Sequence, residues 1–233
     1  MKARKILVSL AALALVAAIS IGGTLAYLTS QTKEVKNTFT VGNVSITLDE
    51  AAVNPDGTQK YKEDGKTPAD RTDNNSYNLL PGHTYLKDPT IHVTSTTDCF
   101  IRAKVTLTNA KEWIAIAAKY ADNKVENIIK GTNDDIWWVS QPNVDTDKNT
   151  VTYTFIYKNE SHTDELGKRI WTSTDSQNLV LFNEIVMPGD MTNDELKTVD
   201  NTQITVIAEA IQADGFNSES AAWAAFENQV NKG

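Results

Sequence analysis

The chain is short of cysteine, glycine, proline and positive charge, and each shortage excludes a class of protein. A single cysteine among 233 residues excludes a disulfide framework and a cysteine-based zinc finger. Eleven glycines and six prolines are too few for a collagen-like or low-complexity chain, and a hydrophobic fraction of 40% is too high for a disordered one. A net charge of -8 argues against a nucleic-acid binder, which needs a basic face.

Common catalytic motifs are also missing from the sequence. It contains no H-E-x-x-H zinc motif, no G-x-S-x-G nucleophile turn and no glycine-rich phosphate loop. Three scattered histidines are weak candidates for metal ligands, although surface or strand-edge positions are the preferred interpretation: His83, His92 and His162. The sequence therefore predicts a protein that is not an enzyme and has no cofactor.

Asp145 and Asp147 begin a pattern that is similar to a calcium-binding loop, in which oxygen ligands alternate along the chain. The pattern then fails, because Thr150 stands where the loop needs glycine and Ile156 stands where it needs a bidentate glutamate. We interpret the segment as a solvated turn. Weak calcium binding at the two aspartates is the alternative.

The few basic residues are unevenly distributed, and three of them open the chain. Lys2, Arg4 and Lys5 precede the apolar run 6–21, and small residues follow it. This order predicts a secretory signal peptide over 1–26, with Thr24 and Ala26 suiting the -3 and -1 sites of a signal peptidase. Cleavage is expected after Ala26, with Tyr27 as the next best position.

A retained membrane anchor is the alternative to cleavage. The apolar run of sixteen residues is slightly shorter than the roughly 17–25 that span a bilayer. After cleavage, 207 residues remain, with 19 basic and 30 acidic side chains and a net charge of -11. The sequence thus predicts a secreted, acidic, extracellular product, bound to neither membrane nor nucleic acid.

Residues 39–233 are predicted to form a single, mainly β domain. Val44, Ile46 and Leu48 alternate with polar residues, which is typical of a half-buried strand. Residues 51–78 are polar and turn-rich, and are expected to form a long surface loop that carries a small hairpin. Segments rich in Val, Ile, Thr and aromatic residues are further predicted strands: 90–94, 100–108, 136–140, 150–158, 178–186 and 202–213.

Two segments have apolar residues at helical spacing, and they predict short helices over 109–122 and 218–230, the second capped by Ser218. Many strands with two short helices indicate an antiparallel β-sandwich or jelly roll. Cys99 is predicted to be a buried thiol. Trp137 and Trp138 are adjacent in a predicted strand, so one should face the core and the other could serve a surface adhesin or ligand-binding module.

Several short elements are similar to those of one family of secreted Gram-positive proteins. They include the stretch 22–30 around the cleavage site, which resembles a G-T-aromatic-A-aromatic sequence with Leu25 and Leu28 in place of aromatics. The others are N-T-F-x-x-G at 37–42, a turn-to-strand element at 80–90, and C-terminal elements at 188–190 and 208–216. Together they resemble the TasA/camelysin family.

This resemblance implies a jelly-roll domain and, for fibre-forming members, polymerisation into biofilm-matrix fibres by exchange of an N-terminal strand. The segment 27–38, with Tyr27, Leu28 and Val35, would be the donor strand of a homopolymer. A disordered tail on a monomeric domain is the alternative. Camelysin-type relatives are classed as zinc metallo-endopeptidases, and zinc would be the cofactor only under that alternative.

Overall fold

The computed structural model describes residues 29–31, 44–162 and 166–230, and strands dominate it. Strands account for 33% of the described residues and helices for 19%, which confirms a mainly β protein with antiparallel sheets. Among the residues so described, no helix has both the length and the apolar character needed to cross a membrane. Several sequence predictions lie outside these residues: the signal peptide 1–26 with Thr24 and Ala26, and the donor residues Tyr27, Leu28 and Val35.

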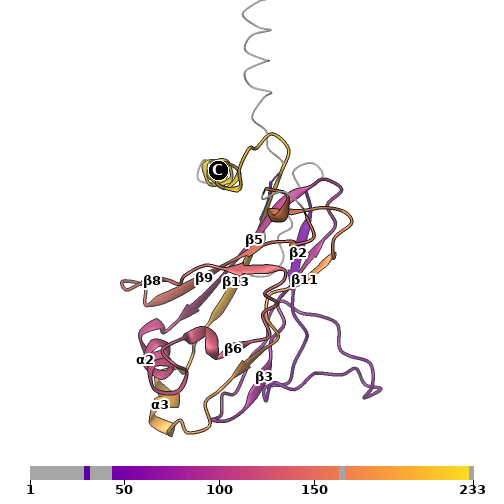
Figure 1. Cartoon of the computed structure of the whole chain (residues 1–233). Coiled ribbons are helices and arrows are strands. Elements are labelled where there is room, and N and C mark those ends of the chain that lie inside the picture. Colours follow the sequence, from indigo (N-terminus) through magenta and orange to yellow (C-terminus); the bar gives the residue numbers. More distant parts are fainter. Residues whose placement is uncertain (1–28, 32–43, 163–165, 231–233) are drawn as a thin grey trace, which may run out of the picture.

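A seven-stranded antiparallel sheet forms the larger layer of the fold (Figure 1). Its strands, in spatial order, are β1 (Thr29–Gln31), β13 (Ile204–Gln212), β5 (Cys99–Thr108), β9 (Thr150–Tyr157) and β7 (Trp137–Val139). Two short strands join it at the sides: β8 (Asn143–Asp145) pairs with β9, and β10 (Ile170–Trp171) pairs with β5.

Strand β5 shows why this sheet has one face in the core and one facing outward. Ala103, Val105 and Leu107 are buried, whereas Arg102 and Lys104, which alternate with them, are only partly buried. Successive side chains of a strand point to opposite faces. The apolar set therefore packs inward, and the charged set defines the outer face.

Two three-stranded antiparallel sheets complete the β structure. The first has the order β11 (Asn178–Val180), β4 (Thr90–Val93) and β2 (Ile46–Asp49). The second has the order β3 (Thr84–Leu86), β12 (Glu184–Val186) and β6 (Ile129–Lys130). Ile46, Ile91 and Leu179 of the first sheet share one hydrophobic core with Trp137 and Tyr157 of the large sheet.

The strand predicted over 178–186 is in fact two strands in different sheets, β11 and β12. Leu181 and Phe182 lie between them and are fully buried. A continuous apolar run in sequence does not reveal where the chain leaves one sheet for another, so the prediction missed this break.

Three α-helices occur in the described part of the chain, one more than predicted. Helices α2 (Ala110–Tyr120) and α4 (Glu219–Val230) lie where apolar spacing placed them. The Ser218 hydroxyl accepts a hydrogen bond from the Ala221 amide at 3.2 Å, as its predicted cap role requires. Helix α3 (Asn193–Thr198) was not predicted, and it has no buried residue. Single 3₁₀ turns form η1 (Val125–Asn127) and η2 (Gly167–Arg169).

The polar segment 51–78 is a surface excursion closed by isolated bridges that pair Glu50 with Thr72, Val53 with Gln59 and Tyr61 with Pro68. These bridges correspond to the small hairpin predicted there. Its first turn depends on Gly57, which has φ +83° and lies so close to Tyr85 that an added Cβ would meet the Tyr85 Cα at 2.7 Å. Only glycine fits this turn without a shift of the neighbouring backbone.

Candidate functional site at the β13 edge

The short strand β1 pairs with an edge of the large sheet. Strand β1 runs antiparallel to β13, with Thr29 opposite Ile211, Ser30 opposite Ala210 and Gln31 opposite Glu209. On its other side β13 pairs with β5 over its full length of nine residues. Strand β1 falls inside the predicted donor segment 27–38, so this edge is the place where such a strand docks.

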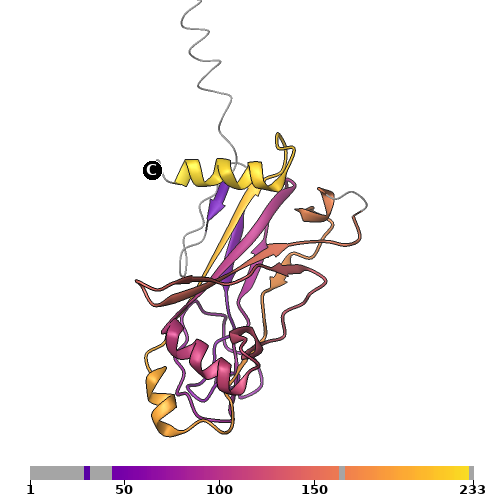
Figure 2. The ribbon, with the colours of Figure 1, turned by 60° about the vertical axis from the view of Figure 1, so that its left-hand side comes forward.

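Helix α4 covers the outer face of the sheet at the same end. Phe100 and Ile211 from the sheet pack against Trp223 and Phe226 of α4 in a second, smaller hydrophobic cluster. The Trp223 and Phe226 rings meet edge to face, with centroids 5.7 Å apart. Strand β1 and helix α4 lie close together at this end of the molecule (Figure 2).

A cluster of four charged side chains connects α4 to the sheet. The Arg102 Nε lies 2.5 Å from Glu209 Oε2, and a second guanidinium nitrogen donates to Glu227 of the helix. The Lys104 Nζ lies 3.1 Å from Glu209 and 3.5 Å from Glu227. Two cations of β5 therefore hold Glu209, the residue that lies opposite Gln31 of β1.

Burial makes this cluster energetically important. The Glu209 side chain is only 3% exposed and that of Arg102 is 11% exposed. Each charge has therefore lost most of its contact with water, and the attraction between the two offsets part of that cost. The Arg102 guanidinium also stacks on the Trp223 ring, 4.1 Å from its centroid. Partial burial opposes ionisation of Glu227, but the Arg102 hydrogen bond and the Lys104 charge outweigh it and lower the Glu227 pKa.

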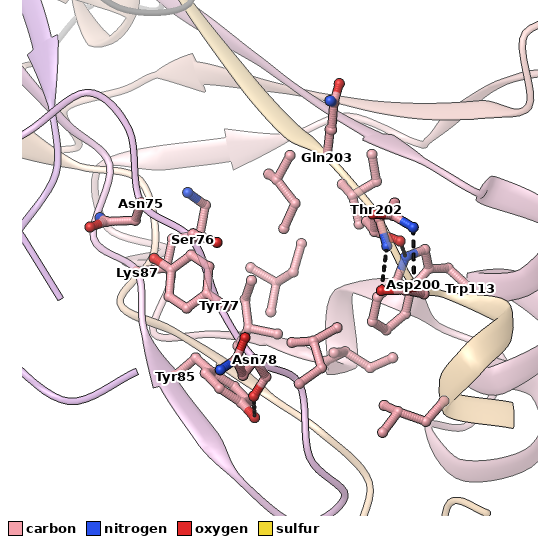
Figure 3. A pocket seen from close by; sticks show the side chains of 18 of the residues that line it. Asn75, Ser76, Tyr77, Asn78, Tyr85, Lys87, Trp113, Asp200, Thr202 and Gln203 are labelled. Atoms are coloured by element: carbon pink, nitrogen blue, oxygen red, sulfur yellow. Dashed lines mark hydrogen bonds between the residues drawn. The ribbon is translucent and has the colours of Figure 1, made fainter. Parts of the chain in front are cut away.

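A cavity of about 700 Å³ opens elsewhere, between the segment 74–79 and the segment 200–204 (Figure 3). Apolar side chains, among them Leu107 and Ile185, line it, and polar groups surround them. Some of these polar groups have partners within the chain: the Trp113 indole donates to the Thr202 hydroxyl at 3.0 Å, and Lys87 pairs with Glu50 at 2.6 Å.

The histidines named as metal candidates have other partners. His92 bridges strands, with Nε2 2.8 Å from Asp49 and Nδ1 2.7 Å from the Asn178 side chain. The His162 Nδ1 lies 2.6 Å from the Gly167 carbonyl oxygen. The exposed His83 ring is tilted against the Tyr85 ring, with centroids 6.3 Å apart.

The Asp145 carboxylate accepts hydrogen bonds from the backbone amides of Asp147 and Lys148, and the Lys148 amide in particular lowers the Asp145 pKa. This arrangement closes a turn, as the sequence predicted. Asp147 is exposed in the same turn. Within residues 29–31, 44–162 and 166–230, no three His, Cys, Asp or Glu side chains come together as a potential metal site.

Cys99 and the tryptophan pair lie as predicted. Cys99 is fully buried, and burial raises the pKa of its thiol to about 12. Trp137 is 1% exposed in the core, whereas Trp138 is 48% exposed on the other side of the strand.

Sequence reasoning missed the Arg102–Glu209–Glu227 cluster and the role of Trp223. One signal could have found it. Glu209 is the single charged residue of Ile204–Gln212, and Arg102 and Lys104 occupy alternate positions of a predicted strand. Charges at alternate positions of strands mark the outward face, and opposite signs on two strands suggest that the strands are neighbours.

No protein-family model, curated protein or solved structure matches this chain. The site is therefore interpreted from its own geometry.

Proposed function

We propose that the mature chain is a secreted structural subunit of extracellular matrix or cell-surface fibres, which assembles by exchange of its N-terminal strand. The pairing of β1 with β13 supports this proposal most directly, because it places residues of the predicted donor segment on a sheet edge. In the fibre, β1 of one subunit would occupy the same edge of the next subunit.

Strand exchange would leave the pairing of β1 with β13 unchanged in kind. The backbone hydrogen bonds between β1 and β13 are the same whether the two strands belong to one chain or to two, so concentration and linker strain decide the outcome. Twelve residues, 32–43, separate β1 from Val44. Fully extended, such a linker reaches about 40 Å, which is enough to cross to a neighbouring subunit. Head-to-tail exchange that does not close on itself produces a filament.

The sequence resemblance to the TasA/camelysin family supports the same proposal, together with a finer description of the fold as a jelly-roll sandwich. The large sheet and the β11–β4–β2 sheet share one core, as the two layers of a sandwich would. The acidic character of the mature chain suits a solvated fibre surface.

Comparison of two purified chains tests the proposal. A chain that begins at Tyr27 is expected to form filaments visible by electron microscopy, whereas one that begins at Thr40 lacks β1 and is expected to stay monomeric. Thermal unfolding of both chains serves as the control for folding. If the longer chain stays monomeric over a range of concentration and pH, or if the shorter chain forms the same filaments, strand exchange is wrong.

A further inference from the structure

We propose that the chain forms an internal amide cross-link between the side chains of Lys87 and Asn75, with Glu50 as the base that promotes the reaction. Glu50 directly precedes the 51–78 excursion, Asn75 lies near the end of that excursion, and Lys87 follows β3. The reaction uses only these three side chains. It does not depend on strand exchange, and it would serve a fibre subunit or a monomer equally.

One carboxylate holds both reacting groups. The Lys87 Nζ lies 2.6 Å from Glu50 Oε2, and the Asn75 Nδ2 donates to Glu50 Oε1 at 3.0 Å. Because the two oxygens belong to the same carboxylate, the amine and the amide lie next to each other. Asn75 and Lys87 lie at the same end of the cavity in Figure 3, together with Tyr77. The Lys87 Nζ is 5.8 Å from the centroid of the Tyr77 ring.

The Lys87 amine lies beside its own general base, in a place with little water. The side chains of Lys87 and Glu50 are only 8% and 10% exposed. A lysine amine attacks a carbonyl carbon only after it has lost a proton, and a base within hydrogen-bond distance can take that proton. Transfer of one proton along the hydrogen bond from Nζ to Glu50 Oε2 therefore leaves a neutral amine next to the amide.

The Asn75 amide is held in place and polarised by its neighbours. Its Nδ2 also donates to the Ala51 carbonyl oxygen at 2.8 Å, and its Oδ1 accepts a hydrogen bond from the Val53 backbone amide at 3.1 Å. Negative charge develops on Oδ1 when an amine attacks the amide carbon, and a fixed N–H donor stabilises that charge. The Val53 amide thus serves as the oxyanion donor.

The reaction balances without an external reagent. A bond forms between Lys87 Nζ and Asn75 Cγ, and the bond between Asn75 Cγ and Nδ2 breaks. The lysine nitrogen gives up two protons: Glu50 passes one of them to the departing nitrogen, which leaves as ammonia, and keeps the other. Asn75 and Lys87 both line the cavity of about 700 Å³, which offers the ammonia a way out.

The new bond would fasten the polar excursion to the segment that joins β3 to β4. A covalent link between two segments restricts the unfolded chain and so stabilises the folded one, as a disulfide does. The single cysteine leaves this chain without an internal disulfide. An amide link supplies a constraint of the same kind, and reducing agents do not break it.

The intact mass of the folded chain that begins at Tyr27 tests the proposal. Loss of one ammonia should place it about 17 Da below the mass calculated from the sequence. Lys87→Arg keeps the positive charge but removes the primary amine, and Glu50→Gln removes the base, so each should show its full calculated mass. Lys62→Arg is the matched control and should keep the deficit, because Lys62 pairs with Asp70 at 2.7 Å on the exposed part of the excursion.

Digestion locates the bond. After chymotrypsin cuts the backbone between Tyr77 and Tyr85, the fragments that carry Asn75 and Lys87 should stay joined under denaturing and reducing conditions. A parent chain of full calculated mass would overturn the proposal, and so would a deficit that persists in Lys87→Arg. The same loss of mass with fragments that separate would also overturn it, because Asn75 would then have lost ammonia to its own backbone as a succinimide. The mass and digestion of the parent chain decide the matter even where a variant fails to fold.

Discussion

At the scale of single residues, the Arg102–Glu209 pair is the most consequential feature near the strand-docking edge. Glu209 is almost completely buried on β13, and the side chains of Arg102 and Lys104 both form ion pairs with its carboxylate. The same arginine stacks on Trp223. One guanidinium thus holds both the edge strand β13 and the helix α4.

Arg102→Met is therefore expected to be strongly destabilising. It removes Arg102 from the buried Glu209 carboxylate, and loss of one partner from a buried ion pair costs about 3–5 kcal/mol. Lys104→Met is the matched control: its side chain is 32% exposed, and about 0–1 kcal/mol is expected. Urea denaturation of both variants measures the difference, and equal losses would contradict the assigned role of Arg102.

We expect the folded chain to lose stability in acid as the Glu227 carboxylate becomes protonated. Its pKa in the folded chain lies below the usual glutamate value, so the ionised form stabilises the fold. That contribution is complete above the pKa of the unfolded chain and is lost as pH falls through the folded pKa. Glu227→Gln should flatten this part of the curve of urea midpoint against pH between 7 and 3. A curve of unchanged shape would show that Glu227 plays no part.

At the scale of elements, helix α4 is a local cover attached through a small cluster. Its buried side chains Ala222, Trp223 and Phe226 belong to a hydrophobic cluster separate from the main core. A helix that rests on few apolar contacts can open without global unfolding.

Trp223→Ala should accordingly release α4 while leaving the sheet folded. The substitution removes the ring on which Arg102 stacks and much of the apolar contact between helix and sheet. Hydrogen exchange should accelerate across 219–230 and remain slow across Ile101–Leu107 of β5. Trp138→Ala, which removes an exposed tryptophan of β7 that is not part of the α4 hydrophobic cluster, is the matched control. Uniform acceleration in both segments would mean that α4 is part of the global folding unit.

The elements that could be predicted from sequence are those whose burial follows a simple period. Trp113, Ile116 and Ala117 marked α2, and the alternation around Val105 marked β5. Helix α3 was missed because it buries no residue and so has no apolar stripe; its signal was local, in the capping box of Thr192 and Glu195. Strands of two or three residues, such as β6 and β10, are too short for any period to be seen.

At the scale of the whole molecule, the feature that matters most for strand exchange is a pairing between strands far apart in the sequence, β1 and β13. Residue 29 lies opposite residue 211, and no local pattern in the sequence specifies that pairing. The family resemblance implied that 27–38 is a donor strand, with a disordered tail as the alternative, and it did not indicate which sheet edge would receive such a strand. Long-range register depends on tertiary packing: β5 pairs with one side of β13, and β1 pairs with the other side.

A pair of cysteines in this register tests strand exchange most directly. Opposite residues of an antiparallel pair have Cα atoms about 4.5–5.5 Å apart, which is within disulfide range, so Ser30→Cys with Ala210→Cys should cross-link β1 to β13. The native Cys99 is buried and its thiol pKa is raised, so it should not interfere.

After oxidation of the chain that begins at Tyr27, a non-reducing gel should show a ladder of covalent multimers that collapses to monomer on reduction. Each single-cysteine variant should give no ladder. A double variant that forms only an intramolecular disulfide, at concentrations where the parent chain makes filaments, would show that β1 stays on its own sheet and that the subunits assemble in another way.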